Sequence, residues 1–441
     1  MGLENGEKKL SREGLVRSIG PLALGTNVFN MVVGAGIFVL PGVVASHLGA
    51  SAIFAYLICG LAVSMIFLCY AEIGSRVRRS GGSYAYIEDA FGPFAGFIAS
   101  MLLWFGWAIL SDAALLVILT ETIILIVPEV DNQIFRILFM TGLIAFLVFT
   151  NVRGVESGKK LYIANTIAKV IPLGLLVIFG FFAINFDNLT ITEWPSVEQI
   201  GASTLILFFA FSGAECALNA SGEIEKPEKT VPRGIMLGIG SILMLYLALQ
   251  TVAQGVLGAD LGNNTEAPLS ATAEIIFGSW GGKMLLVGTA ISIFATLSGD
   301  ILVTPRVVFA SARDGNLPKF LAKVHPKFNT PYMSVIVFSA LLLLIAFSGT
   351  FETLAILASG SIMLIYAGVS LSVIKVRMRD GMPSREQFKL PGGAIIPMLS
   401  CSLIAWMLFQ LETNEALGLI ALVGVSVLIY LANQLMKKKS S

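Results

Sequence analysis

Four ionisable residues lie inside long apolar stretches of the sequence: Asp112, Lys169, Glu215 and Asp300. A charged side chain at the centre of a membrane helix costs about 2.5–3.5 kcal/mol and is usually kept for a function. A carboxylate as deep as Asp112 can take up a proton near neutral pH, because burial disfavours the charged form. Glu215 and Asp300 are acids of the same kind. These residues indicate ion or proton chemistry within a membrane.

Lys169 stands about nine residues into its apolar stretch, too deep for its ammonium group to reach the surface readily. It therefore needs a partner inside the protein. The candidates are backbone carbonyls near residues 30–36 and the carboxylates of Asp112 and Asp300. A purely structural ion pair is the alternative to a functional role.

The segment NMVVGAGIFVLP, residues 30–41, interrupts an apolar run with Gly34 and Gly36 on either side of Ala35. Glycine weakens a helix, and backbone groups bared inside a bilayer are tolerated only where they line a cavity or contact a ligand. A helix that begins near Gly36 would direct free N–H groups and its positive end at this point, which suits a carboxylate. The alternative is that the small residues let a neighbouring helix approach closely.

A second interruption, Ser212–Gly213–Ala214, lies inside LILFFAFSGAECALNAS, residues 205–221. Backbone carbonyls freed near Val32, and near Phe209, Ala210 and Ser212, would suit an ammonium group. The two interruptions together predict a receptor for a zwitterion. Phe209 and Phe211 add aromatic bulk, and one of them could close over the ligand; ordinary packing is the other interpretation of both.

The composition identifies an integral membrane protein. Of 441 residues, 56% are hydrophobic and 13% are charged, against roughly 25% charged in soluble domains. A net charge of +1 gives no attraction to nucleic acid. With two histidines and no CxxC spacing, we expect no metal site. We also expect no cofactor and no enzymatic activity, because no catalytic constellation is present.

Apolar runs of about 20 residues predict membrane spans. The sequence has twelve such runs, and we expect all of them to lie in a single membrane transport domain, residues 1–441. They lie near 19–46, 50–74, 96–127, 134–151, 161–184, 200–221, 232–257, 281–311, 331–349, 352–375, 393–411 and 414–435.

The basic residues test this count, because lysine and arginine next to short loops stay in the cytoplasm. With the N-terminus inside, the inner segments hold 25 of the 29 basic residues, and the outer segments hold only Arg136 and Lys283. One miscounted span would reverse every later loop. We therefore expect a multi-pass protein of the cell (inner) membrane with both termini cytoplasmic.

The two interruptions lie in the first and sixth predicted spans. Because the second interruption comes five spans after the first, and five is odd, the halves 19–184 and 200–375 would run in opposite directions, as an inverted repeat led in each half by a broken helix. Such repeats place a binding site near the middle of the bilayer. Residues 393–435 would add two further helices.

Several long motifs, in order along the chain, resemble the amino acid, polyamine and organocation (APC) superfamily of transporters. The matching segments are GAGIFVLP, YAEIGSRVRRSGGSYAYIEDAFGP, FFAFSGAE, GEIEKPEKTVPRGI and ARDGNLPKFLAKVHPKFNTP. The resemblance covers essentially the whole chain. It implies an all-α fold of twelve transmembrane helices, a leucine-transporter-like 5+5 inverted repeat with broken helices 1 and 6, plus helices 11 and 12.

The resemblance also implies roles by position. In similar permeases the segment matching Gly34, Ala35 and Gly36 holds the substrate carboxylate. Carbonyls matching Val32, Phe209 and Ser212 hold the α-amino group, and the aromatic residue matching Phe209 is a gate. A lysine matching Lys169 occurs in sodium-independent members, where its ammonium group resembles a substitute for sodium between helices 1 and 8.

Two alignments of the third span remain open. Aligning Trp107 with the tryptophan of cationic amino acid members puts Asp112 on their glutamate, although Ser111–Asp112–Ala113 departs from their Leu–Glu–Tyr. Aligning Trp104 instead with the third-helix tryptophan of arginine/agmatine exchangers puts Ser111 at the position that faces the substrate in those exchangers. Asp300 falls where those exchangers carry a substrate-facing aromatic residue. An acid there could prefer a cationic side chain, pair with Lys169 or relay a proton.

We therefore predict a secondary active transporter that moves an α-amino acid by alternating access, coupled to protons and independent of sodium. Its partners would be the amino acid, the proton and the lipid bilayer, with no nucleic acid; an accessory subunit stays open. The alternatives are an obligate amino acid exchanger or a polyamine transporter, and more remotely a sensor or a channel on the same fold.

Overall fold

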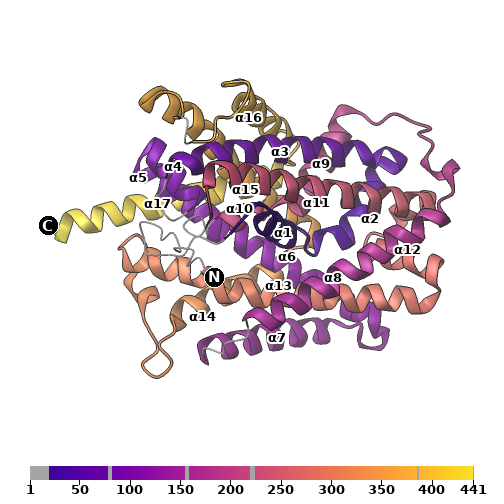
Figure 1. Ribbon diagram of the computed structural model, residues 1–441. Coiled ribbons are helices and arrows are strands. Elements are labelled where there is room, and N and C mark those ends of the chain that lie inside the picture. The colour runs from indigo at the N-terminus through magenta and orange to yellow at the C-terminus, as the bar shows by residue number, and fades with distance from the viewer. Residues whose placement is uncertain (1–18, 78–81, 154–157, 219–223, 385–386, 441) are drawn as a thin grey trace, which may run out of the picture.

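The computed structural model describes residues 19–77, 82–153, 158–218, 224–384 and 387–440 (Figure 1). The N-terminal segment expected in the cytoplasm, and the basic residues Arg78, Arg79 and Arg385, lie outside these ranges. The described chain is helical, and its only strand-type pairing is an isolated bridge between Ile19 and Ile224. Its α-helices are α1 (Pro21–Val32), α2 (Gly36–Leu48), α3 (Ala52–Arg76), α4 (Ser83–Phe91), α5 (Pro93–Met101), α6 (Leu110–Ile126), α7 (Gln133–Arg153), α8 (Gly158–Gly180), α9 (Val197–Phe211), α10 (Ala214–Leu218), α11 (Pro227–Leu257), α12 (Pro268–Phe277), α13 (Ser279–Arg313), α14 (Tyr332–Ala346), α15 (Phe351–Asp380), α16 (Ile395–Leu408) and α17 (Thr413–Ser440).

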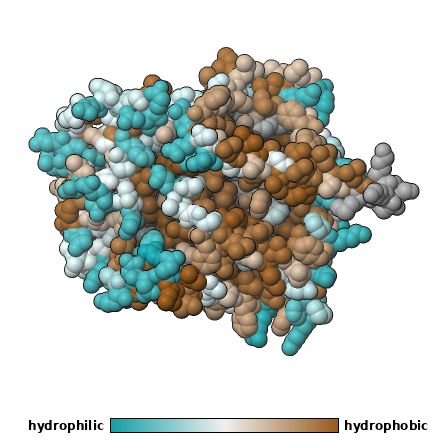
Figure 2. All heavy atoms as spheres, turned by 180° about the vertical axis from the view of Figure 1, so that it is seen from behind, coloured by the Kyte–Doolittle hydropathy of each residue, from teal (hydrophilic) through white to brown (hydrophobic). Residues whose placement is uncertain are grey.

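Within the described ranges, eight helical stretches are long and apolar enough to cross a membrane. Shorter apolar helices cover 169–183, 268–277, 332–346 and 395–408. Each of the twelve predicted apolar runs coincides with one or two of the helices, although the count of twelve crossings stays a prediction. Figure 2 shows one face of the molecule, with hydrophobic residues across its middle and hydrophilic residues gathered mainly at its left edge. This pattern suits a protein whose sides face lipid.

Both glycine-containing interruptions fall between helices. Helix α1 begins with Pro21 in its first turn and ends at Val32, after which Val33 takes an extended conformation. Helix α2 begins at Gly36. Helix α9 begins with a capping box between Ser196 and Gln199 and ends at Phe211.

The interruptions lie in the interior of the bundle. Helix α1 packs along α11 and also contacts α10, while α2 packs against α9. Figure 1 shows α1 and α10 in the middle of the view, with α7 and α16 at opposite edges. Val32, Val33 and Ala35 are buried, as are Phe211 and Ser212. Backbone groups at both interruptions are therefore shielded from the sides of the bundle.

A π-helical segment, η2 (Leu102–Ile109), joins α5 to α6, so residues 93–126 form one continuous helical stretch. π-Helical turns widen a helix locally and frequently occur at functional sites. Apolar periodicity did not predict this segment. It carries Trp104 and Trp107, the two tryptophans on which the alternative alignments of the third span depend.

A buried ion pair joins α3 to α15 where both helices end. Glu72 is fully buried and accepts two hydrogen bonds from the guanidinium group of Arg377, one of them from Nε at 2.7 Å. The backbone N–H of Leu390 donates to the same carboxylate at 2.8 Å, and Arg76 lies 3.6 Å away. The contacts of Glu72 therefore tie the ends of α3 and α15 together, which is a structural role.

We predict that Arg377→Leu lowers the free energy of unfolding by about 3–5 kcal/mol, because the buried Glu72 carboxylate loses the guanidinium group that donates two hydrogen bonds to it. The double variant Glu72→Leu/Arg377→Leu should lose less than the sum of the two single variants. Chemical unfolding in detergent would measure both. The control Arg379→Leu removes a guanidinium group that is 45% exposed, and should cost less than about 1 kcal/mol. If Arg377→Leu and Arg379→Leu lose the same free energy of unfolding, the structural role of the Glu72–Arg377 pair is wrong.

Candidate functional site

The two interruptions are joined by one side chain. Tyr246 of α11 is fully buried, and its hydroxyl lies 3.3 Å from the carbonyl oxygen of Val32 and 3.0 Å from that of Ala210. A helix end leaves carbonyls without partners inside the helix, and a buried tyrosine hydroxyl needs a partner. Tyr246 was not predicted from the sequence, although a tyrosine in the middle of an apolar run is a usable signal.

The second interruption has its own local support. Ser212 follows α9 in an extended conformation, and its hydroxyl donates to the carbonyl of Phe208 at 2.9 Å. Gly213 has a φ of +110°, which favours glycine, and a Cβ there would lie 3.2 Å from the carbonyl oxygen of Met31. The backbones of the two interruptions therefore approach each other closely at Gly213.

Glu215 stabilises this turn. Its carboxylate accepts the backbone N–H of Gly213 at 3.2 Å and the hydroxyl of Tyr366 on α15, and the residue is 3% exposed. Tyr366 packs edge-on against Phe208. The contacts of Glu215 thus join α10, the turn before it and α15, and they explain how an acid is accommodated at this depth.

The glycines of the first interruption differ in their surroundings. A Cβ at Gly36 would lie 3.1 Å from Cα of Ala210 and 3.2 Å from the ring of Phe209, so only glycine fits without a shift. A Cβ at Gly34 would meet nothing closer than the carbonyl oxygen of Val32, at 3.7 Å. Gly36 therefore lets α2 pack closely against α9. Gly34 has open space beside it.

The two phenylalanines of α9 also differ. Phe209 lies in a cluster of three aromatic rings, 5.9 Å from Trp107 in the π-helical segment and 5.8 Å from Phe351 at the start of α15. Phe211 packs instead against Tyr56 and Tyr246 in the interior. The ring of Phe209 thus contacts η2 and the start of α15, while the contacts of Phe211 are those of core packing.

Lys169 lies 2% exposed on α8, and its ammonium group donates to the carbonyl oxygen of Asn30 at 2.5 Å. Asn30 is in the last turn of α1, directly before the first interruption. Of the partners considered from the sequence, the structure therefore gives Lys169 a backbone carbonyl of this region. The side-chain oxygen of Asn30 is buried and makes no hydrogen bond.

The structure brings the side chains of Asp112 on α6 and Asp300 on α13 together as an interacting pair. Asp112 is 1% exposed, and one of its carboxylate oxygens makes no hydrogen bond. Two carboxylates at short range repel when both are charged, so such a pair favours holding a proton. The neighbouring Ser111 is half-buried.

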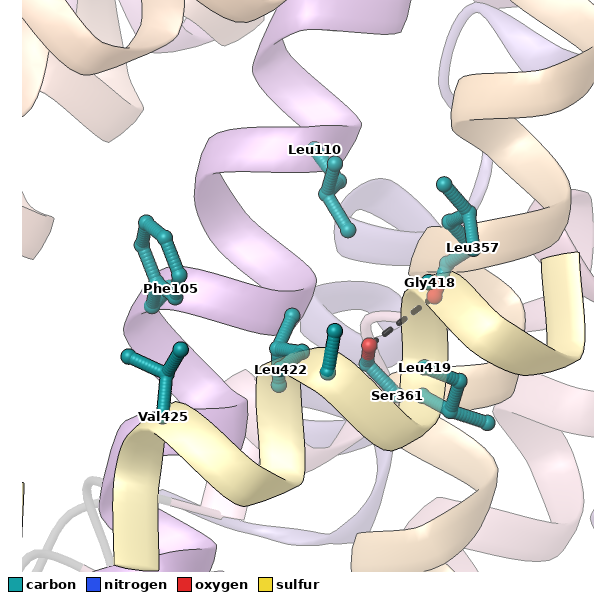
Figure 3. A pocket seen from close by; sticks show the side chains of 9 residues that line it. Phe105, Leu110, Leu357, Ser361, Gly418, Leu419, Leu422 and Val425 are labelled. Atoms are coloured by element: carbon teal, nitrogen blue, oxygen red, sulfur yellow. Dashed lines mark hydrogen bonds between the residues drawn. The ribbon is translucent and has the colours of Figure 1, made fainter. Parts of the chain in front are cut away.

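An apolar cavity of about 250 Å³ lies apart from these residues, between α17, α15 and the stretch that contains η2 and α6. Figure 3 shows Leu422 and Val425 of α17 facing Phe105 and Leu110 across it. Its one hydroxyl, that of Ser361, donates to the carbonyl of Leu357 within the same helix. None of the residues predicted for substrate or ion binding lines this cavity.

Comparison with known proteins gives consistent matches along the whole chain. A family model described as amino acid permease matches residues 19–430. The chain is 30% identical to the serine/threonine exchanger SteT of Bacillus subtilis, over 95% of each chain. It is 29% identical to the mouse Asc-type amino acid transporter 1, over 83% of this chain and 72% of the mouse protein. It is 24% identical to the branched-chain amino acid permease BcaP of Bacillus subtilis, over 97% of this chain and 94% of BcaP.

The two glycines give a matched pair of variants. We predict that Gly36→Ala lowers the free energy of unfolding by about 1–3 kcal/mol, because the added methyl group forces α2 away from α9. Gly34→Ala should leave stability nearly unchanged, because a Cβ has room there. Unfolding in detergent would compare the two purified variants. If both lose the same stability, the difference in packing that we describe is wrong.

Proposed function

Because the chain belongs to the amino acid permease family, we propose that it is a secondary active transporter that moves an α-amino acid across the membrane by alternating access. The observation that carries the proposal is the convergence of two interrupted helices in the interior of an apolar helical bundle. Interrupted membrane helices expose backbone donors and acceptors that can bind a substrate.

We assign the substrate's two charged groups to opposite kinds of helix end. The carboxylate would lie at the start of α2, where Gly34, Ala35 and Gly36 present N–H groups and a positive helix end. The ammonium group would lie at the carbonyls of Val32, Phe209 and Ser212, with Ala210 beside them. The space next to Gly34 supports this arrangement, since a substrate group can come close to the backbone there.

Phe209 would act as the gate. Its ring belongs to α9, while its ring contacts belong to η2 and α15, so movement of α9 would change all of these contacts together. Closure over a bound substrate would exclude water from the interrupted helices. Exclusion of water strengthens the polar contacts made there.

Lys169 supports transport without sodium. Its ammonium group already supplies a positive charge to a carbonyl at the end of α1, in the region where the resemblance implies a sodium ion in other transporters. A second cation nearby would be repelled. We therefore propose that Lys169, which extends from α8, replaces a sodium ion between the first and eighth predicted spans, which are α1 and α13 here.

We assign the coupling proton to Asp112 and Asp300 acting together. The pair lies between α6 and α13, and one shared proton would relieve its repulsion. Ser111, on the same turn as Asp112, would face the substrate. A membrane potential of 100 mV contributes about 2.3 kcal/mol for each charge that crosses, so one proton per cycle is enough to drive accumulation.

The proposed topology has twelve crossings, with both termini in the cytoplasm of the cell (inner) membrane. Residues 19–184 and 200–375 would form the two inverted halves, and 393–435 the last two crossings. Two observations support it: the helices coincide with the predicted apolar runs, and α1 and α9 end at matching points of the two halves. In this topology, 25 of the 29 basic residues fall in inner segments of the sequence.

Exchange of amino acids without net proton movement is the second candidate. The relative SteT, matched over 95% of the chain, is named a serine/threonine exchanger. The two mechanisms differ in a measurable way, since an exchanger requires substrate on the opposite side of the membrane and a symporter does not.

We predict that Lys169→Ala abolishes coupled amino acid uptake in proteoliposomes, because the carbonyl of Asn30 loses its donor and α1 loses its tie to α8. The control Lys283→Ala removes an exposed ammonium group from α13 and should retain wild-type uptake. If Lys169→Ala transports like wild type, or if wild type needs sodium for uptake, the assigned role of Lys169 is wrong.

We predict that an inward proton gradient drives amino acid uptake into empty proteoliposomes, and that Asp112→Asn removes this dependence. The amide cannot share a proton with Asp300 as a second carboxyl group does. Glu129→Gln, at an exposed position, is the control and should keep the dependence. Uptake that appears only in vesicles preloaded with amino acid would identify an exchanger. Uptake driven by sodium and not by protons would contradict proton coupling.

A further inference from the structure

A polar cavity of about 460 Å³ lies at the C-terminal end of α2, away from the two interruptions. It is enclosed by the turn between α2 and α3, the connection 187–195, the first turn of α9 and the end of α11. Small-molecule sites are typically cavities of about 300–1,000 Å³. None of the residues assigned to the amino acid or the proton lines it.

Two buried residues in its lining carry polar atoms without partners. Ser51 is 1% exposed and Gln254 is 4% exposed, and neither the Ser51 hydroxyl oxygen nor Oε1 of Gln254 makes a hydrogen bond. The amide nitrogen of Gln254 donates to the carbonyls of Asn188 and Gly258, at 3.3 and 3.1 Å. These two bonds fix the side chain and leave its oxygen as a free acceptor. A buried acceptor without a donor is costly, so a ligand that donates hydrogen bonds would be stabilised here.

The edge of the cavity adds negative charge and an aromatic ring. The carboxylate residues Asp187 and Glu193 line it and are exposed. Trp194 stacks on Phe54 with ring centroids 5.6 Å apart, while the residue stays 75% exposed, so the other face of its indole is accessible. Among the described residues of the lining, His47 is the one basic side chain, and it is exposed.

We propose that this cavity binds a small organic cation that carries a primary ammonium group. An ammonium group has three donors and no acceptor, which matches the free Gln254 oxygen and the Ser51 hydroxyl. The Asp187 and Glu193 carboxylates attract its charge, and the Trp194 face can contact a cation directly. The site is additional to the proposed amino acid site and does not depend on it.

Titration calorimetry of the full-length protein in detergent, with putrescine as the probe, tests the site. Wild type should bind saturably, and Asp187→Asn/Glu193→Gln should bind at least 10-fold more weakly. Gln254→Leu should also lose at least 10-fold. Asp187 and Glu193 are exposed, so we expect the double variant to fold. Its binding therefore tests the proposal even if Gln254→Leu fails to fold.

The matched control Asp260→Asn/Glu266→Gln removes the same charge at exposed positions outside the lining, and should bind within 2-fold of wild type. Lys169→Ala should also bind like wild type. No saturable binding by wild type, equal weakening by the two double variants, or full binding by Gln254→Leu would each overturn the proposal. If Lys169→Ala alone loses putrescine binding, the amine binds near the interruptions and not in this cavity, and the proposal is wrong.

Discussion

The rest of the structure depends on one constraint: backbone polar groups inside a membrane must have partners. Two helices of the bundle stop at Val32 and Phe211, and each stop leaves carbonyls that no helical N–H can reach. The protein supplies partners from other helices. The hydroxyl of Tyr246 reaches both stops, the ammonium group of Lys169 reaches the last turn of α1, and the carboxylate of Glu215 accepts the N–H of Gly213. Three polar side chains in apolar helices are thereby explained by one requirement.

Local sequence signals located much of this arrangement. Helices end or begin beside Gly34, Gly36 and Gly213, because helix weakness at glycine is a property of the residue itself. Apolar run lengths predicted where the helices lie. The motifs predicted the family, which the match over residues 19–430 confirms. The number of membrane crossings, the orientation and the substrate-binding residues remain predictions.

What the sequence could not predict are the contacts between distant segments. Lys169 had three candidate partners, and only the packing of α8 against α11 and α13 brings its ammonium group to the carbonyl of Asn30. The pairing of Asp112 with Asp300 joins helices that are almost 200 residues apart. The π-helical turn that brings Trp107 to Phe209 follows no apolar period. Each of these depends on helix rotation and register, which single-sequence patterns do not determine.

The Tyr246 hydroxyl bears on how a substrate would act at the interruptions. Its single O–H is shared between the carbonyls of Val32 and Ala210, two acceptors in the region proposed to bind an ammonium group. A carbonyl has two lone pairs, so both can be shared, but a charge-assisted hydrogen bond is roughly twice as strong as a neutral one. An amino acid that binds there would therefore compete with Tyr246 and loosen the tie between α11 and the two interruptions. Because a ligand shifts a conformational equilibrium only through contacts that differ between the states, this exchange of partners is a physical route from substrate binding to helix movement.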